Sequence, residues 1–447
     1  MKPLPRAELG LLGLGTGILI LTVIAVSLHV PGSIWAGTLP RKDAVVALML
    51  TSGLLYAAAV TVVTHLPVRR RAFWPVIAIA IALRMTMVFA PPFMSSDIYR
   101  YVWDGRVQYA GINPYIYVPA DAPLAGLRDT AIYPSINRAG YAHTIYPPAA
   151  QMIFAAVVSV RPSVLAMKIA MLALEACGIA AMLELLARAQ LPRARILIYV
   201  WNPLPLWAIA GDGHIDGAAI GLLGMAMLAL VARRSSLSGA LLGAAILTKF
   251  LPLAVVPALW RRWDWKMLLS GGAMIACLYA WYANAGWLVL GFLPNYTHEE
   301  GLAGGSGFWL VSLLGHGISL PHWAGEAYVL IAACVLCAVA GSMIFSRNPD
   351  TSPVAIGDRV AILAAATTAA MSAHYPWYYA WLALPSCLST RPVVLWLSVA
   401  PMILYSDPWH DEIWLQSAVF LPALAILGAE FWRRIPGPLA LSLQRKI

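Results

Sequence analysis

Long apolar runs follow one another from one end of the chain to the other, separated by short polar segments. They cover residues 11–30, 44–66, 73–90, 164–187, 196–210, 218–231, 237–247, 267–293, 327–345, 360–373, 392–405 and 413–431. Several reach the roughly 20 residues that a helix needs to span a bilayer, and the shorter ones fit broken or tilted spans. We therefore predict an all-α protein, a polytopic transmembrane helical bundle of about 11 to 14 spans.

Composition supports a membrane protein and excludes a soluble one. Hydrophobic residues make up 61% of the chain and charged residues only 11%, against about a quarter in soluble domains. The first run lacks a small-residue cleavage site and is too long for a signal peptide, so we expect it to be retained. The net charge of +10 is spread over short loops, which argues against nucleic-acid binding. All five cysteines lie inside apolar segments, where small hydrophobic residues are common.

Basic residues mark one set of loops. They gather at residues 69–71, 188–195, 233–234, 261–266, 347–359, 391 and 433–434. Cytoplasmic loops of membrane proteins are enriched in Lys and Arg, so these loops and both termini are predicted to be cytoplasmic. The loops outside are then 97–147, 212–216, 295–300, 374–379 and 407–412. Arg41 and Lys42 lie on the wrong side of this scheme.

Two regions do not fit simple crossings. Residues 149–160 and 164–187 are both apolar, yet the topology allows only one crossing there, so the first is predicted to be a partial or re-entrant helix. Residues 237–247 and 251–260 read as half-helices that meet at Lys249. Irregular backbone at membrane depth is tolerated where it lines a cavity or is buried in protein. No internal repeat is evident, which weighs against transporter folds built from inverted halves.

The segment of residues 91–147 carries four Asp and four Arg and is rich in Tyr and Pro. We expect short helices at the membrane interface there. Asp97 directly follows an apolar run, where apolar surroundings raise the pKa of a carboxylate toward that of a useful general base. Asp97, Tyr101 and Asp104 fall at helical spacing, as do Arg100 and Asp104. From spacing alone, a water-facing interfacial helix with an Arg100–Asp104 pair is the slightly favoured interpretation.

A resemblance changes this balance. The run of residues 97–115, followed by residues 144–148, resembles the GT-C superfamily of membrane glycosyltransferases. It is most similar to the glycosyltransferase family 87 type, which includes polyprenyl-phosphomannose-dependent mannosyltransferases. Shorter matches follow in the right order at residues 201–203, 213–217, 249–250 and 374–378. Because such enzymes usually carry the Asp after their first span, residues 1–70 are interpreted as an N-terminal two-span extension. Residues 71–390 would be the catalytic membrane module, and residues 391–447 the C-terminal spans and tail.

The resemblance implies an inverting glycosyltransferase that moves a sugar, preferably mannose, from a polyprenyl phosphate to a lipid- or glycan-linked acceptor hydroxyl. Asp97 would be the general base. Basic groups would stabilise the leaving phosphate. The expected substrate-binding residues are Arg84, Arg100, Tyr101, Asp104, Arg106, Asn113, Tyr115, His143, Tyr146, Asn202, His214, Asp216, Lys249, His374, Tyr375, Trp377 and Tyr378. Arg84 and Lys249 have an alternative interpretation as side chains that snorkel to the interface, and the aromatic residues as an interfacial belt.

No cofactor and no metal are expected. His214 and Asp216 are conceivable metal ligands, but a cluster that binds sugar hydroxyls is the preferred interpretation. The expected partners are the polyprenyl-phosphate sugar, the acceptor and membrane lipids, with no nucleic acid. The expected location is a bacterial inner (plasma) membrane, with the active site facing the periplasm or exterior. A transporter or flippase, and a polymerase or ligase of lipid-linked sugars, remain the alternative functions.

Overall fold

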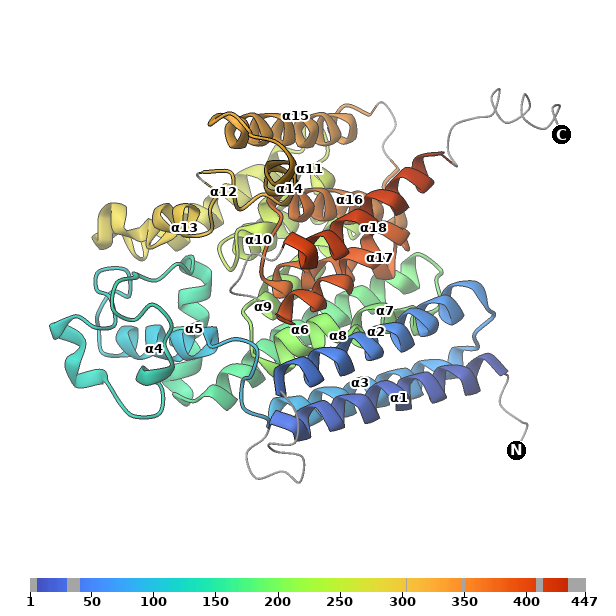
Figure 1. Ribbon diagram of the computed structural model, residues 1–447, viewed down its shortest axis with the longest axis horizontal. Coiled ribbons are helices and arrows are strands. Elements are labelled where there is room, and N and C mark those ends of the chain that lie inside the picture. Colours follow the sequence, from blue (N-terminus) through green and yellow to red (C-terminus); the bar gives the residue numbers. More distant parts are fainter. Residues whose placement is uncertain (1–5, 30–40, 303, 347–349, 407–412, 433–447) are drawn as a thin grey trace.

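The computed structural model describes residues 6–29, 41–302, 304–346, 350–406 and 413–432. The basic groups expected at Arg347 and at Arg433 and Arg434, and the loop of residues 407–412, lie outside the described residues. Every regular element in the described part of the chain is a helix, which confirms the all-α class (Figure 1).

The first half of the chain consists of ten α-helices and several short 3-10 or π turns. The α-helices are α1 (Arg6–His29), α2 (Arg41–His65), α3 (Phe73–Val88), α4 (Asp97–Tyr109), α5 (Pro148–Val160), α6 (Val164–Arg188), α7 (Leu197–Val200), α8 (Pro203–Pro205), α9 (Asp216–Val231) and α10 (Ser235–Ile246). The loop after α4 contains the short turns η2 (Ala122–Leu127) and η3 (Tyr133–Ser135). Short helices therefore occur in the 91–147 segment, as expected.

The second half is more irregular. Its α-helices are α11 (Val256–Leu259), α12 (Trp265–Ala280), α13 (Leu293–Glu299), α14 (Trp309–Gly317), α15 (Ala324–Ile344), α16 (Pro353–Met371), α17 (Pro392–Leu397) and α18 (Ile413–Trp432). The 3-10 turns η6 (Leu251–Val255), η7 (Ala283–Leu290), η8 (Pro376–Ala383) and η10 (Ala400–Ser406) connect them.

Seven helices among the described residues are long and apolar enough to cross a membrane, or up to nine if each of two bent pairs forms one span. This is fewer than the 11 to 14 spans expected, because several apolar runs fold as shorter helices. Three apolar helices are shorter than a full span: Pro148–Val160, Ser235–Ile246 and Pro392–Ser406. The first matches the expected partial helix, and the second is followed by the expected break at Lys249.

The run of residues 267–293, expected to be one span, is instead bent. Helix α12 ends at Ala280, and the next helical stretch leaves at 108°. Polar contacts with the 91–147 segment explain the bend. The hydroxyl of Tyr282 donates to Oε1 of Gln108 at 2.7 Å, and Nδ2 of Asn113 donates to Oδ1 of Asn284 at 2.5 Å.

Close backbone packing joins the helices at the centre. A Cβ placed on Gly178 of α6 would lie 2.8 Å from Cα of Gly221 of α9, and one on Gly221 would lie 2.1 Å from the oxygen of Leu174. Small residues allow such approach, which is how membrane helices gain packing energy where lipid is as apolar as the helix surface.

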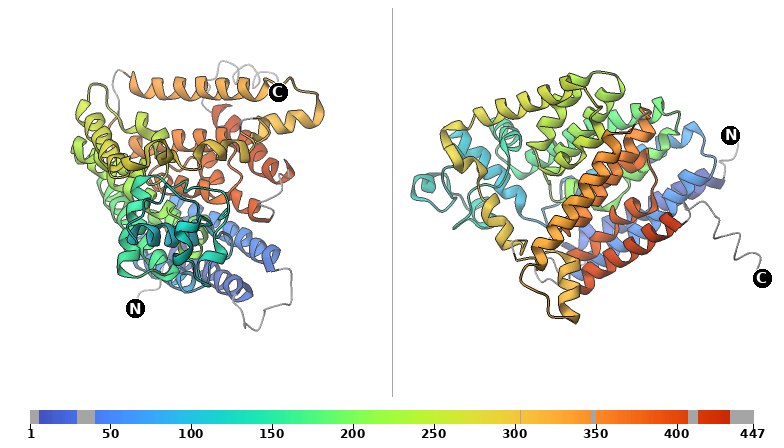
Figure 2. Two further views of the ribbon diagram at one scale, coloured as in Figure 1. Left: turned by 90° about the vertical axis from the view of Figure 1, so that its left-hand side faces the viewer. Right: turned by 90° about the horizontal axis from the view of Figure 1, so that it is seen from above.

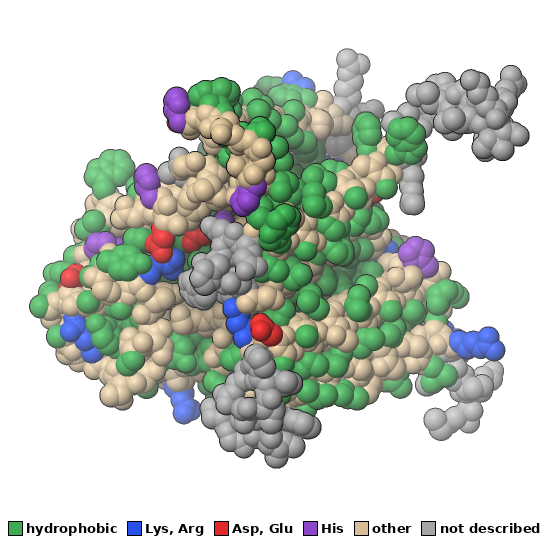
Figure 3. All heavy atoms as spheres, viewed as in Figure 1, with side chains coloured by type: hydrophobic (Ala, Val, Ile, Leu, Met, Phe, Trp, Pro, Cys, Tyr) green, Lys and Arg blue, Asp and Glu red, His purple; other side chains and the backbone are tan. Residues whose placement is uncertain are grey.

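The bundle has a polar end and an apolar flank. Residues 97–147 with α4 and α5 form one end, whereas α1 begins and α18 ends toward the opposite end (Figures 1 and 2). Figure 3 shows mostly hydrophobic side chains over the flank, with Lys, Arg, Asp and Glu gathered near the 97–147 end. The helices and their apolar flank show an integral membrane protein.

Candidate active site

Asp97 opens α4, directly after the segment that leaves α3. Its carboxylate is partly enclosed, with 21% of the side chain exposed. Nδ2 of Asn137 donates a hydrogen bond of 2.8 Å to Oδ1, and Nδ1 of His214 lies 3.8 Å from Oδ2. Burial raises the pKa of Asp97, although the Asn137 hydrogen bond and the positive charges of Lys249 and Arg138 act in the other direction. A carboxylate with a raised pKa is a stronger base, which suits it to accept a proton.

A second acidic group, Asp216, forms an ion pair with Lys249, whose positive charge acts on Asp97. Nζ of Lys249 donates to both oxygens of Asp216, at 2.7 and 2.8 Å. Asp216 is the first residue of α9, and Lys249 lies in the break after α10. The ammonium group also lies 4.1 Å from the ring centre of Tyr378, a cation–π contact. The half-helices expected at Lys249 therefore place one positive charge beside the polar face of the bundle.

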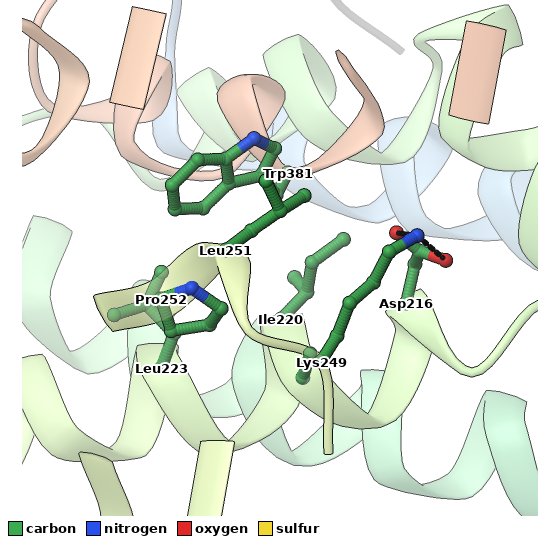
Figure 4. Close-up of a pocket in the computed structure, with 8 residues that line it drawn as sticks. Asp216, Ile220, Leu223, Lys249, Leu251, Pro252 and Trp381 are labelled. Atoms are coloured by element: carbon green, nitrogen blue, oxygen red, sulfur yellow. Dashed lines mark hydrogen bonds and ion pairs between the residues drawn. The ribbon is translucent and has the colours of Figure 1, made fainter. Parts of the chain in front are cut away.

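Lys249 and Asp216 also border a small pocket of apolar walls. It is partly open, with about 230 Å³ of space including its open side. The other lining residues are Ala219, Ile220, Leu223, Leu251, Pro252 and Trp381. Figure 4 shows the Lys249 side chain extending to Asp216, with Ile220 next to it. The pocket therefore combines the positively charged ammonium group of Lys249 with apolar walls, and this combination suits a lipid phosphate.

Aromatic side chains surround His214. Its ring stacks on Trp377 with centroids 4.4 Å apart, and Trp377 stacks on Tyr375 at 4.7 Å. Nε2 of His214 is buried and has no hydrogen-bond partner among the described residues. A substrate hydroxyl is a natural partner for this nitrogen, because an unmet buried polar atom costs free energy.

Arg138 joins the 97–147 loop to α13 and to the residue after it, and its charge acts on Asp97. Nε of Arg138 lies 2.6 Å from Oε1 of Glu299, and Nη2 lies 3.8 Å from Glu300. The hydroxyl groups of Tyr296 and Tyr378 lie 3.2 Å apart. Arg138 has a φ of 52°, which is uncommon outside glycine. Backbone strain of this kind occurs at functional sites, where surrounding contacts maintain it.

Asp104 faces a buried network rather than Asp97. Nε of Arg100 donates to Oδ1 of Asp104 at 2.7 Å, with both side chains at most 5% exposed. Nε2 of Gln151 donates to Oδ2 of Asp104 at 2.9 Å and to Oγ1 of Thr144 at 2.8 Å. The expected Arg100–Asp104 pair is present, but the water-facing setting is wrong, because α5 covers this face of α4.

Tyr101 and Tyr146 form one wall of the site. Their rings meet edge to face at 4.8 Å, and both are next to Phe154. The backbone N–H of Ile215 donates to the hydroxyl of Tyr101 at 3.5 Å. The hydroxyl of Tyr115 donates to the carbonyl of Tyr146 at 2.8 Å, one step farther out.

Four of the expected substrate-binding residues lie outside this cluster, namely Arg84, Arg106, Asn113 and Asn202. Arg84 donates from Nη2 to Oε1 of Glu175 at 2.7 Å and from Nη1 to the carbonyl of Val200 at 3.0 Å. Asn202 donates to both oxygens of Ser398 at 3.1 Å. These contacts join helices within the bundle. For Arg84, the alternative interpretation as a snorkelling side chain is replaced by a buried ion pair with Glu175.

Arg106 and Asn113 bind partners within the loops. Arg106 pairs with Asp129, and although burial acts in the other direction, the Arg106 hydrogen bond lowers the pKa of Asp129 to about 2. Asn113 joins Asn284, as described above.

Two histidines complete the expected set. Nε2 of His374 lies 3.1 Å from the carbonyl of Gly307, and Nδ1 lies 3.4 Å from Nε2 of Gln416. His143 is half-buried, and its Nδ1 lacks a hydrogen-bond partner among the described residues.

Sequence reasoning missed Asn137 and Arg138, which lie in an irregular loop with no periodic signal. It also missed Tyr296, Glu299 and Glu300 on α13 and after it, and the buried Lys168 and Glu175 of α6. A charge inside an apolar run was the available signal for the last two.

Among the described residues, no group of three His, Cys, Asp or Glu side chains could hold a metal ion. Metal independence stays a prediction.

Comparison with known proteins gives the family. Residues 9–264 match the model of the alpha-(1→6)-mannopyranosyltransferase N-terminal domain. This match includes α1 and α2, which we expected to be an extension, and all of Asp97, Asp216 and Lys249. No curated protein and no solved structure matches the chain. The resemblance to membrane mannosyltransferases is thereby confirmed. Because the match covers more than half of the chain, the protein belongs to the alpha-(1→6)-mannopyranosyltransferase family.

Proposed function

We propose that the protein transfers mannose from a polyprenyl phosphate carrier to an acceptor hydroxyl on the extracytoplasmic face, with inversion and with Asp97 as general base. The observation that carries this proposal is the partly enclosed Asp97 carboxylate next to the Lys249–Asp216 pair and its apolar pocket. A base, a positive charge and an apolar wall are the three features that such a reaction needs.

In the proposed reaction, the acceptor hydroxyl gives its proton to the Asp97 carboxylate. The acceptor oxygen attacks the anomeric carbon from the face opposite the phosphate. The bond between that carbon and the phosphate oxygen breaks, and its electron pair stays on the phosphate. Lys249 stabilises the negative charge of the leaving polyprenyl phosphate. The isoprenoid chain of this phosphate lies along Ile220, Leu223 and Leu251.

Arg84 and Arg100 are not part of this proposal, because their ion pairs with Glu175 and Asp104 are buried within the bundle. Lys249 and Arg138 also have acidic partners, but theirs are the positive charges that act on Asp97. Arg138 takes their place as the second positive charge, because its charge acts on Asp97. His214, Tyr146 and Trp377 are proposed to contact the sugar.

The direction of the helices supports an extracytoplasmic site. Helix α3 leads from the basic residues 69–71 to the segment before Asp97, and α9 leads from Asp216 to Arg233 and Arg234. Each has 16 residues, which span about 24 Å at 1.5 Å per residue. The basic clusters therefore lie far from the site along the membrane normal, and the Lys/Arg rule assigns them to the cytoplasm.

The test uses purified protein in detergent with radiolabelled polyprenyl-phosphate mannose and a short mannoside acceptor on an alkyl chain. We expect transfer by the native protein and a loss of turnover of about a hundred- to ten-thousand-fold in Asp97→Asn. Asp121→Asn, in the same loop, should keep normal turnover, because this carboxylate accepts the backbone N–H of Val118 within its own turn. Normal turnover in Asp97→Asn, or turnover of a nucleotide sugar without lipid, would refute the proposal.

Movement of the labelled lipid across vesicles without transfer would instead identify a transporter.

The orientation of the protein in the membrane has a separate test. A cysteine at the exposed Ala120 should react with an impermeant reagent on intact cells, and one at the exposed Ser236 should not. Labelling at residue 236 but not at residue 120 would contradict the proposed orientation.

A further inference from the structure

Residues 212–216 contact the chain on both sides of Asp97. Oδ1 of Asp212 accepts the backbone N–H groups of Phe93 at 2.9 Å and of Met94 at 3.1 Å. Asp212 is 2% exposed, and its other oxygen is buried without a hydrogen-bond partner among the described residues. A buried carboxylate that accepts two backbone N–H groups fixes the segment that leads into the base.

The next residue of this turn packs against α4 itself. Gly213 has a φ of 72°, and a Cβ placed on it would lie 2.3 Å from Cδ1 of Ile98. Only glycine combines this backbone conformation with such close approach. The following His214 lies beside Asp97, and Ile215 bonds the hydroxyl of Tyr101. One short turn thus contacts the chain before, at and after the proposed base.

Lys168 of α6 holds the same segment from its other end. Its side chain is fully buried, and Nζ donates to the carbonyls of Ala90 at 2.6 Å and Met87 at 3.3 Å. Met87 lies in the last turn of α3 and Ala90 lies two residues beyond its end, so Lys168 bonds the backbone where the chain leaves the helix. Lys168 and Asp212 also attract each other electrostatically. The ring of His29 also stacks on Phe93 of this segment, with centroids 4.6 Å apart.

We propose that Lys168 and Asp212 are positioning residues, which hold residues 87–94 so that Asp97 lies in line with the acceptor hydroxyl. This inference rests on the proposed role of Asp97 as base. Neither side chain is bonded to the Asp97 carboxylate, and both act through backbone groups. A base displaced by about 1 Å loses up to about a hundredfold in rate, so the clamp acts on turnover rather than on donor binding.

The experiment compares Asp212→Ala with Asp212→Asn. Asparagine keeps an oxygen that can accept the Phe93 and Met94 N–H groups, whereas alanine removes it. We expect Asp212→Ala to lower kcat between about tenfold and about a hundredfold, with a donor KM close to native. Asp212→Asn should recover most of kcat. Asp358→Ala, which removes an ion pair with Arg391 elsewhere in the bundle, controls for lost stability and should leave kcat unchanged.

Native kcat in Asp212→Ala, or equal losses in the alanine and asparagine variants, would overturn the inference. If Asp212→Ala does not fold, the neutral double variant Lys168→Gln/Asp212→Asn is compared with Lys168→Met/Asp212→Asn, which lacks the donor to Ala90. A lower kcat only in the methionine variant supports the clamp, and equal kcat values overturn it. Asp97→Asn, assayed in parallel, separates the two proposals, because its full activity would refute the base itself.

Discussion

Asn137 donates a hydrogen bond of 2.8 Å to Oδ1 of Asp97 from 40 positions farther along the chain. The irregular chain that follows α4 thereby returns to the first turn of this helix and holds the carboxylate. Burial and this hydrogen bond act on the same group in opposite directions, since one disfavours the charge and the other stabilises it. The balance between these two effects determines the pKa of Asp97, and so the pH range in which it can act as a base.

Replacing Asn137 by Ala should shift the acidic limb of the kcat/KM profile to higher pH. The Asn137 hydrogen bond lowers the pKa of Asp97, so its loss lets burial raise that pKa further. A pH series with polyprenyl-phosphate mannose measures the limb, with Ser135→Ala in the same loop as the control. A limb that stays in place or moves to lower pH would contradict the role of Asn137.

Asp97→Asn should be at least as stable as the native protein at neutral pH. Burial raises the folded-state pKa of Asp97 above its usual 3.8, so native stability declines as the pH rises through that folded-state pKa. Asparagine has no charge to bury, so the variant should not lose stability in this way. Thermal unfolding in detergent between pH 4 and pH 8 measures the difference in stability between the variant and the native protein. The advantage of the variant should be small at the acid end and grow with pH, and a constant or shrinking difference would refute the raised pKa.

Lys249→Gln should lower kcat by about a hundred- to a thousandfold, because the leaving phosphate loses its nearest positive charge. Lys249→Arg should retain more activity, since it keeps the charge near Asp216. Steady-state transfer assays with varied donor give kcat and KM. Lys266→Gln, on the predicted cytoplasmic side, serves as the control. Equal activity of the Gln and Arg variants would remove Lys249 from the mechanism.

Asp104→Asn should impair folding rather than chemistry. It leaves the buried Arg100 charge unpaired and turns an amide donor toward Nε2 of Gln151. Breaking a buried ion pair by removing one partner costs about 3–5 kcal/mol. Yield and the thermal unfolding midpoint in detergent measure the loss. Glu184→Gln, which breaks an exposed pair with Arg188, should cost less than about 1 kcal/mol. Similar losses in the two variants would be inconsistent with a buried network at Asp104.

The expected break at Lys249 is present, between the end of α10 at Ile246 and the start of η6 at Leu251. Pro252 favours such a break, because it lacks a backbone N–H and disfavours helical backbone at the residue before it. The bend after Ala280 was not foreseen. Tyr282 and Asn284 looked like minor interruptions of an apolar run, and their partners Gln108 and Asn113 lie about 170 positions away. A local pattern contains no information about partners at that distance.

The sequence by itself determined that this protein lies in a membrane, and it located Asp97 at the end of an apolar run. Both follow from local features, since lipid requires continuous apolar helices and a carboxylate at their edge stands out. Only the tertiary structure decided which polar residues share the site. Asn137, Arg138 and the 212–216 turn reach Asp97 through loops, whereas Arg84 and Asp104 are turned to buried partners. Loop paths depend on packing between distant segments, so side-chain spacing along the chain cannot predict them.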